Sequence, residues 1–120
     1  MSYNYELTIS RARLAFDSGI TKNVQFRKGE LRSLYLFLEE NQSVIISALN
    51  EDLCKPEFET IVSEIDFVMN DIRSAIYNID DYVEEKPVGK SLVTLFDDSF
   101  IHNEPFGVVL VIGAWNYPIQ

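Results

Sequence analysis

Two side chains in the sequence have types suited to nucleophilic or metal chemistry: Cys54 and His102, the only cysteine and the only histidine. Cys54 lies in a short link before Pro56, and Lys55 is the only neighbour in sequence that could favour a reactive thiolate. His102 has no cysteine, histidine or carboxylate at metal-ligand spacing, so we expect it at a surface or an interface. Neither residue predicts a catalytic or metal site.

A third candidate is Asn116, in the turn sequence Gly113–Pro118 that follows the uninterrupted apolar run Val108–Ile112. A strand that is apolar on both faces is typical of the centre of a parallel sheet. Ligands of open α/β sheets gather beyond the carboxyl ends of such strands. An asparagine in a strand-to-helix turn most often caps the helix or shapes the turn. The residue types alone therefore favour a structural role for Asn116.

Three amphipathic helices should precede this strand, over about residues 5–18, 24–50 and 56–83. The third should open with Pro56 at its first helical position, and Pro87-Val88-Gly89 should end it. Apolar residues recur at three- and four-residue steps along the second and third helices, which predicts one continuous buried face on each. These residues are Leu31, Leu34, Tyr35, Leu38, Ile45 and Leu49 in the second helix, and Phe58, Ile61, Val62, Ile65, Val68, Ile72, Ile76, Ile79 and Val83 in the third.

After Gly89 the period of apolar residues changes to two, over residues 92–96 and 100–103. Asp97-Asp98-Ser99 between these runs suits a turn, so a hairpin or a bent strand pair is expected. The pairs Asp97-Asp98 and Asp80-Asp81 are interpreted as turn and solvated-helix charge rather than as an acid/base pair.

Composition and charge exclude several classes of protein. Of the 120 residues 47% are apolar, and 19 acidic against 10 basic residues give a net charge of -9. A soluble globular segment is expected, and its charge disfavours nucleic acid and anionic lipid as partners. The start Met1–Glu6 lacks the basic and apolar parts of a secretory signal, and no apolar run approaches the roughly 20 residues of a membrane span. One cysteine excludes an internal disulfide and indicates a reducing, cytoplasmic location.

The segment Glu104–Pro118 closely resembles the segment that opens the nucleotide-binding domain of class-3 (fatty) aldehyde dehydrogenases. The resemblance covers nearly the whole chain in the expected order. Further matching blocks are Phe16–Gly19, Val24–Arg27, Asp52–Lys55 and Ile101–Pro105. It implies an incomplete α/β fold with N-terminal helices, a β-hairpin of the oligomerisation sheet and the first strand of a Rossmann-like domain.

The resemblance also implies a division of the chain. Residues 1–88 would be the helical part of the nucleotide-binding domain, 89–105 the oligomerisation hairpin, and 106–120 the first strand and turn of the NAD(P)-binding domain. A buried parallel strand needs neighbouring strands and crossover helices, and none remain after Gln120. The chain is therefore expected to be the N-terminal segment of a longer enzyme, in which a C-terminal tail could provide membrane attachment.

The activity implied is oxidation of aldehydes, medium- to long-chain aliphatic or aromatic, to carboxylic acids with NAD or NADP. In this family a cysteine thiolate attacks the aldehyde, a hydride passes to the cofactor, and a glutamate-activated water releases the acid. That cysteine and glutamate are expected beyond residue 120, so the segment alone should be inactive. A homodimer formed through residues 89–105 is expected of the full protein.

The resemblance assigns five site residues. Asn116 would donate its side-chain amide to the aldehyde oxygen as that oxygen gains negative charge. Four residues would line the nicotinamide end of the cofactor site: Ile112, Gly113, Ala114 and Trp115. The chain lacks the G-x-G-x-x-G fingerprint, but this family binds its cofactor without it. No metal is implied.

Two other functions remain open from the sequence. The helices could form a small module whose apolar faces dock a partner protein, although an interior strand ending in Trp115-Asn116 does not suit such a module. Alternatively, the chain could be a short isoform that pairs with full-length subunits through the strands near Phe100. Co-purification with the full enzyme would identify that case.

Overall fold

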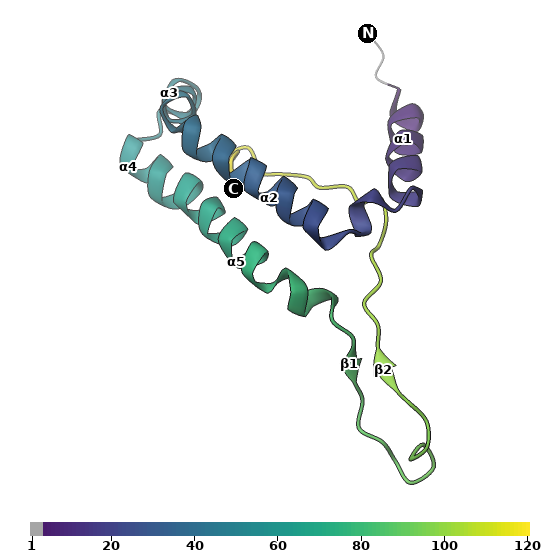
Figure 1. Ribbon diagram of the computed structural model, residues 1–120. Helices are drawn as coiled ribbons and strands as arrows, with labels where there is room; N and C mark the ends of the chain where they lie inside the picture. Colours follow the sequence, from purple (N-terminus) through teal and green to yellow (C-terminus); the bar gives the residue numbers. More distant parts are fainter. Residues whose placement is uncertain (1–3) are drawn as a thin grey trace.

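The computed structural model describes residues 4–120, so the expectations for Met1–Tyr3, including the absence of a secretory signal, lie partly outside it. The chain is mostly helical, with one short two-stranded antiparallel sheet (Figure 1). In order, its elements are α1 (Tyr5–Asp17), the 3₁₀ turn η1 (Ile20–Lys22), α2 (Val24–Glu40), α3 (Gln42–Leu53), α4 (Glu57–Thr60), the π-helical turn η2 (Ile61–Ile65), α5 (Asp66–Val83), β1 (Lys86–Pro87) and β2 (Phe100–Ile101).

Asparagine side chains begin the first two long helices. Oδ1 of Asn4 accepts the amide of Leu7 at 3.1 Å, and Oδ1 of Asn23 accepts the amide of Phe26 at 3.0 Å. Each bond satisfies one of the amides that have no partner within the helix. Gly19, with a φ of 78°, turns the chain between α1 and η1. Because α1 stands to one side of the other helices (Figure 1), none of its residues is buried.

The core lies between the antiparallel helices α2 and α5 and beneath α3. Its buried residues are Leu38, Ile45, Leu49, Ile65, Met69 and Ile72. At the far end of the helix pair, Lys28 of α2 forms an ion pair of 2.5 Å with Asp80 of α5. The predicted apolar faces therefore meet each other, and this packing forms the core of the fold.

The second predicted helix, 24–50, is in fact two helices. Asn41 leaves the helical conformation with a ψ of 14°, and its side chain donates to the carbonyl of Phe37 at 2.8 Å. The backbone amide of Asn41 bonds to the same carbonyl at 3.1 Å, so the helical ladder runs up to the break. The apolar face is also narrower than predicted, because Leu34 is exposed. The single continuous helix was therefore wrong, although Leu38, Ile45 and Leu49 are buried as predicted.

The third predicted helix begins one residue later than expected and is interrupted by a π turn. Pro56 is the N-cap, so the helix starts at Glu57, and η2 separates α4 from α5. A turn with i→i+5 bonds holds more residues than an α turn, so it rotates the residues before it relative to those after it. Phe58 and Val62 are consequently exposed, against the prediction, while Ile65, Ile72 and Ile79 are buried as expected.

The predicted hairpin within residues 92–103 was wrong in its pairing. The antiparallel partners are Lys86 with Ile101 and Pro87 with Phe100. Residues 91–97 form turns instead, with the amide of Thr94 bonded to the carbonyl of Ser91 at 3.1 Å. The alternating residues have no core to face, because β1, β2 and the segment between them project away from the helices as an arm (Figure 1). Leu92, Val93 and Phe96 are almost fully exposed on it.

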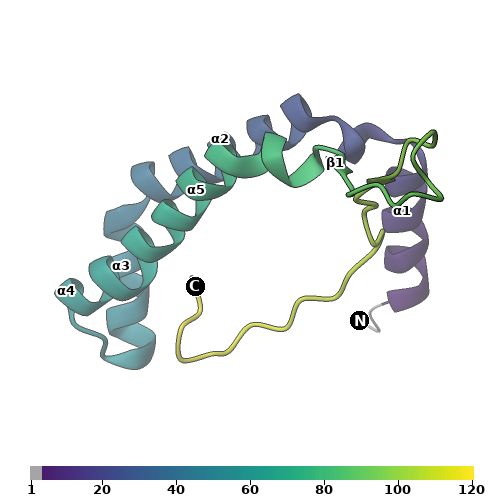
Figure 2. The same cartoon turned by 90° about the horizontal axis from the view of Figure 1, so that it is seen from below.

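The predicted central strand, 108–112, runs as an unpaired extended segment. A strand needs a neighbour for its hydrogen bonds, and no described residue lies beside this segment as one. After Gly107, with a φ of 93°, the segment spans the open side of the helices and returns toward α3 and α5 (Figure 2). None of the described helices is long and apolar enough to cross a bilayer.

Candidate functional site

The turn that carries Asn116 is attached to the helices by a buried ion pair between Lys55 and Glu64. The ammonium of Lys55 also donates to the backbone carbonyl of Asn116 at 2.9 Å. Oε2 of Glu64 accepts the backbone amide of Ile119 at 2.8 Å. We call these contacts the turn anchor. The two backbone contacts join residues 61 and 55 positions apart in sequence.

Lys55 reaches the turn because of the way α3 ends. Cys54 takes a left-handed conformation with a φ of 52°, and its amide bonds to the carbonyl of Asn50 at 2.9 Å. The side chain of Asn50 donates to the carbonyl of Lys55 at 3.3 Å. The side chain of Lys55 is only 7% exposed, and its ammonium lies 4.2 Å from the centre of the Tyr117 ring. That contact has cation–π geometry.

Glu64 is fully buried, at 0% exposure, and belongs to the π turn η2. Such turns occur often at functional sites, because they redirect side chains from a helix. Here the turn places a carboxylate between the apolar core and the C-terminal segment. A buried carboxylate is tolerated when it is paired and hydrogen-bonded, and Glu64 has both kinds of partner.

The five predicted site residues lie together on the exposed side of this turn. Asn116 is exposed, and its side-chain amide forms no hydrogen bond with the described residues. Ile112 and Trp115 are 85% and 86% exposed, and Gly113 and Ala114 between them are exposed as well. The side chain of Asn116 therefore caps no helix within residues 4–120. Its backbone is held, while its amide is free to meet a ligand.

Sequence reasoning missed Lys55 and Glu64. A signal for Glu64 was present: it lies three residues after Ile61 and four before Val68, so a charged residue interrupts the apolar face at helical spacing. A carboxylate at such a position needs a buried partner. The identity of that partner could not be read from the sequence, because Lys55 lies in the preceding link.

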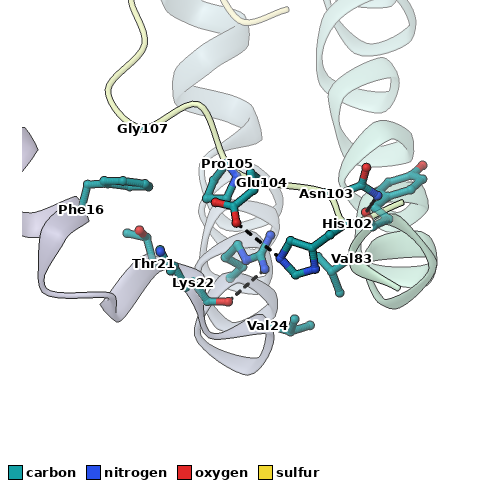
Figure 3. A pocket seen from close by; sticks show the side chains of 12 residues that line it. Phe16, Thr21, Lys22, Val24, Val83, His102, Asn103, Glu104, Pro105 and Gly107 are labelled. Atoms are coloured by element: carbon teal, nitrogen blue, oxygen red, sulfur yellow. Dashed lines mark hydrogen bonds and ion pairs between the residues drawn. The ribbon is translucent and has the colours of Figure 1, made fainter. Parts of the chain in front are cut away.

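A cleft of about 640 Å³ lies at the other end of the molecule, between η1, the start of α2, the end of α5 and residues 102–107. Figure 3 shows its side chains, which include both basic and acidic groups. Nη2 of Arg27 donates to the carbonyl of Lys22 at 3.0 Å, and Nε2 of His102 lies 3.6 Å from a carboxylate oxygen of Glu104. None of the five predicted site residues lines this cleft.

His102 and Cys54 are both on the surface, as expected of His102. Nδ1 of His102 lies 2.8 Å from Oε1 of Glu85, so the histidine links the residue after β2 to the segment after α5. Among residues 4–120, no group of three or more histidine, cysteine or acidic side chains could hold a metal ion. Asp80 pairs with the largely buried Lys28, and Asp98 pairs with Lys90; both carboxylates are themselves exposed, consistent with solvated charge.

The sequence matches the model of the family described as "Aldehyde dehydrogenase family" over residues 2–120. The chain belongs to the aldehyde dehydrogenase family. This assignment confirms the resemblance carried by Glu104–Pro118 and the blocks before it. The known relatives are also of the class that the resemblance indicated. The dimeric NADP-preferring aldehyde dehydrogenase of Rattus norvegicus is 45% identical over 94% of this chain. Aldehyde dehydrogenase family 3 member B1 of Bos taurus is 43% identical over the same share.

A solved aldehyde dehydrogenase shares the fold. The substrate-bound state of AldH of Staphylococcus aureus matches 99% of this chain with a TM-score of 0.94 and 30% sequence identity. The chain spans about a quarter of the length of these relatives: 25% of the rat enzyme, 24% of the bovine enzyme and 26% of the bacterial one. The α/β fold class of an aldehyde dehydrogenase is therefore confirmed for the part that this chain covers.

Proposed function

We propose that the protein containing this chain oxidises aldehydes to carboxylic acids with NAD or NADP, and that Asn116 stabilises the charge that develops on the aldehyde oxygen. The observation that carries the proposal is the arrangement at Asn116. Its backbone is bonded to a buried ammonium, while its side-chain amide is exposed and unbonded within residues 4–120. A fixed donor lowers the barrier most, because no reorganisation is needed during the reaction.

The exposed turn also fits a nicotinamide ring. Ile112 and Trp115 offer apolar side chains, and Gly113 and Ala114 between them offer backbone groups in an exposed segment. We assign these four residues to the nicotinamide end of the cofactor site. When bound, NAD or NADP supplies the hydride acceptor. The rat relative is named NADP-preferring, which supports a nicotinamide cofactor but does not choose between the two forms here.

The aldehydes proposed are medium- or long-chain aliphatic, or aromatic. Steady-state assays test the proposal in the complete polypeptide encoded by the gene, with such an aldehyde and each cofactor. Asn116→Ala should lower kcat by about 10²–10³, the usual effect of losing one oxyanion donor. Asn70→Ala is the matched control, because Asn70 is an exposed asparagine on α5, far along the chain from the turn. Equal kcat values for the two variants would refute the role of Asn116.

The 120-residue chain alone should show no turnover, because the cysteine nucleophile and glutamate base of the family reaction have no counterpart assigned within it. The assay compares the purified chain with a heat-inactivated sample, in NAD+ or NADP+ with a medium-chain aldehyde. Turnover clearly above the inactivated sample would contradict this part of the proposal.

A homodimer through residues 89–105 is the proposed assembly of the whole protein. The projecting arm exposes Leu92, Val93 and Phe96, three large apolar side chains that gain from being covered. The name of the rat relative describes that enzyme as dimeric. Phe96→Asp together with Leu92→Asp should shift the complete polypeptide from dimer to monomer in light scattering. Phe58→Asp, on an exposed face of α4, should leave the mass unchanged.

A further inference from the structure

In the turn anchor, the ammonium of Lys55 uses all of its N–H groups, and the carboxylate of Glu64 uses both of its oxygens. The ammonium of Lys55 has three N–H groups, and three partners surround it: Oε1 of Glu64, the carbonyl of Asn116 and the face of Tyr117. The second oxygen of Glu64 is bonded to the amide of Ile119. Both backbone contacts lie within four residues of chain, on the two sides of Pro118.

The two buried charges and the turn depend on one another. A charge removed from water is tolerated only while its partners satisfy it. If the turn moved away, Glu64 would keep one partner for two oxygens, and Lys55 would lose the carbonyl and the ring. The turn is likewise held by this pair and by Ile119, which packs against the core, since Leu110, Val111 and Ile112 before it are exposed. The position of the turn is thus fixed from inside the helical core.

We propose that Lys55 and Glu64 are positioning residues for the side chain of Asn116. This inference rests on the proposed function, because it takes Asn116 as the donor to the aldehyde oxygen. Lys55 holds the peptide that follows Asn116 by its carbonyl, and Glu64 holds the chain three residues later. Together they fix where the amide of Asn116 points, without touching aldehyde or cofactor themselves.

The main test replaces both charges at once, in the complete polypeptide. Lys55→Met with Glu64→Leu leaves no buried charge unpaired, and such replacements are often neutral for stability. It removes both contacts to the turn, however, and misplacing a catalytic group by about 1 Å can cost roughly 10²-fold in rate. We expect kcat to fall by about 10- to 100-fold, with the KM for NAD(P)+ and the thermal midpoint close to those of the parent protein.

A matched control removes a different ion pair, the one between Lys28 and Asp80. Lys28→Met with Asp80→Leu deletes the pair between α2 and α5, which has no contact with residues 116–119. This variant should keep kcat within about twofold of the parent, because neither residue touches the turn and the exposed carboxylate of Asp80 is screened by solvent. If both double variants lower kcat equally, the effect is one of general stability and the positioning role is refuted.

A double-mutant cycle separates this inference from the proposed function. Two residues that act through a third give non-additive losses. In the Asn116→Ala background, the Lys55→Met and Glu64→Leu changes should therefore lower kcat no further. A full additional loss overturns the positioning role. If instead Asn116→Ala alone does not lower kcat, the proposed function, on which this inference rests, is refuted. If Asn116→Ala is impaired but the anchor variant is not, only the positioning role fails.

Lys55→Arg provides a second variant in case the double replacement does not fold. Arginine keeps the positive charge, so Glu64 stays paired, but its planar fork cannot place donors where the compact ammonium does. The turn should shift, and kcat should fall at least about threefold in the parent and not at all in the Asn116→Ala background. An unchanged kcat for Lys55→Arg in a folded protein whose Asn116→Ala variant is impaired would contradict the proposal.

Discussion

Lys55 and Asn116 meet at 2.9 Å, ammonium to backbone carbonyl, although 61 positions separate them in the sequence. The contact joins the link between α3 and α4 to the turn beyond the predicted strand. The carbonyl of Asn116 is thus bonded to the helical body, while its side-chain amide is exposed and has no partner within residues 4–120.

Removing one charge of the turn anchor should destabilise the protein more than removing both. Glu64→Gln leaves the ammonium of Lys55 buried without a counter-charge, which typically costs about 3–5 kcal/mol. Thermal unfolding of the complete polypeptide, followed by circular dichroism, should show a lower midpoint for Glu64→Gln than for the double replacement of Lys55 and Glu64. The reverse order would show that the pair is not desolvated as described.

Glycine at position 54 should stabilise the protein. Cys54 has a φ of 52°, a left-handed conformation that costs an L-residue roughly 1–2 kcal/mol and glycine almost nothing. Cys54→Gly should therefore raise the free energy of unfolding by about 1 kcal/mol. Ser47→Gly, in the middle of the same helix α3, should lower it by about 0.5 kcal/mol. If both replacements destabilise, position 54 is not left-handed in solution.

Cys54 should also be dispensable for catalysis. The thiol is exposed, and none of the contacts of the turn anchor involves Cys54. Cys54→Ser in the complete polypeptide should leave kcat and KM unchanged within about twofold, set against the far larger loss expected for Asn116→Ala. A loss of comparable size would place Cys54 in the chemistry, contrary to our interpretation.

The two asparagine caps should differ in their effect on the whole protein. Replacing such a cap by alanine costs about 0.5–2 kcal/mol of helix stability. Asn23 caps α2, which packs in the core, whereas Asn4 caps α1, which buries no residue. Asn23→Ala should lower the global unfolding midpoint, while Asn4→Ala should only speed amide hydrogen exchange within α1. Equal shifts of the midpoint would mean that α1 folds together with the core.

The extended segment should make the 120-residue chain bind apolar dyes. Leu110, Val111 and Ile112 are each about 85% exposed in the described structure. Contiguous apolar surface of this kind binds dyes and promotes association. Leu110→Lys should weaken the fluorescence of an anilinonaphthalene dye, whereas Ser43→Lys, which adds the same charge on α3, should not. Equal fluorescence in the two variants would locate the dye elsewhere.

Much of the helical fold could be predicted from the sequence, because helices are specified locally. Spacing of apolar residues identified Leu38, Ile45 and Leu49 as core, and all three are buried. The same spacing could not reveal the break at Asn41, since the apolar period continues across it. The break is a local change of backbone conformation at Asn41, where ψ is 14°, and periodicity does not measure backbone torsions.

The strands were harder to predict, because pairing depends on what lies beside them. The alternation in residues 92–96 suggested a strand, but no face is buried there and those residues turn. The pairing falls instead at Lys86–Pro87, which carries no strand pattern of its own. For the segment 108–112, the apolar character was evident, but a hydrogen-bonded ladder needs partners that the described residues do not supply.

At the candidate site, the resemblance named Asn116 and the four residues before it, and their roles remain predictions. It did not name the residues beneath them. Glu64 lies on a predicted helix face, yet only the π turn aims its carboxylate at Ile119. Local patterns cannot anticipate such a turn, because it depends on contacts with a segment that lies 55 positions later.

The order of synthesis gives the π turn a kinetic consequence. A ribosome releases η2 well before it releases Ile119, at about 5–20 residues per second. For several seconds Oε2 of Glu64 has no backbone amide to accept, and Lys55 is the partner already synthesised. Full satisfaction of this buried carboxylate is therefore a late event in synthesis, because it requires an amide 55 positions further along the chain.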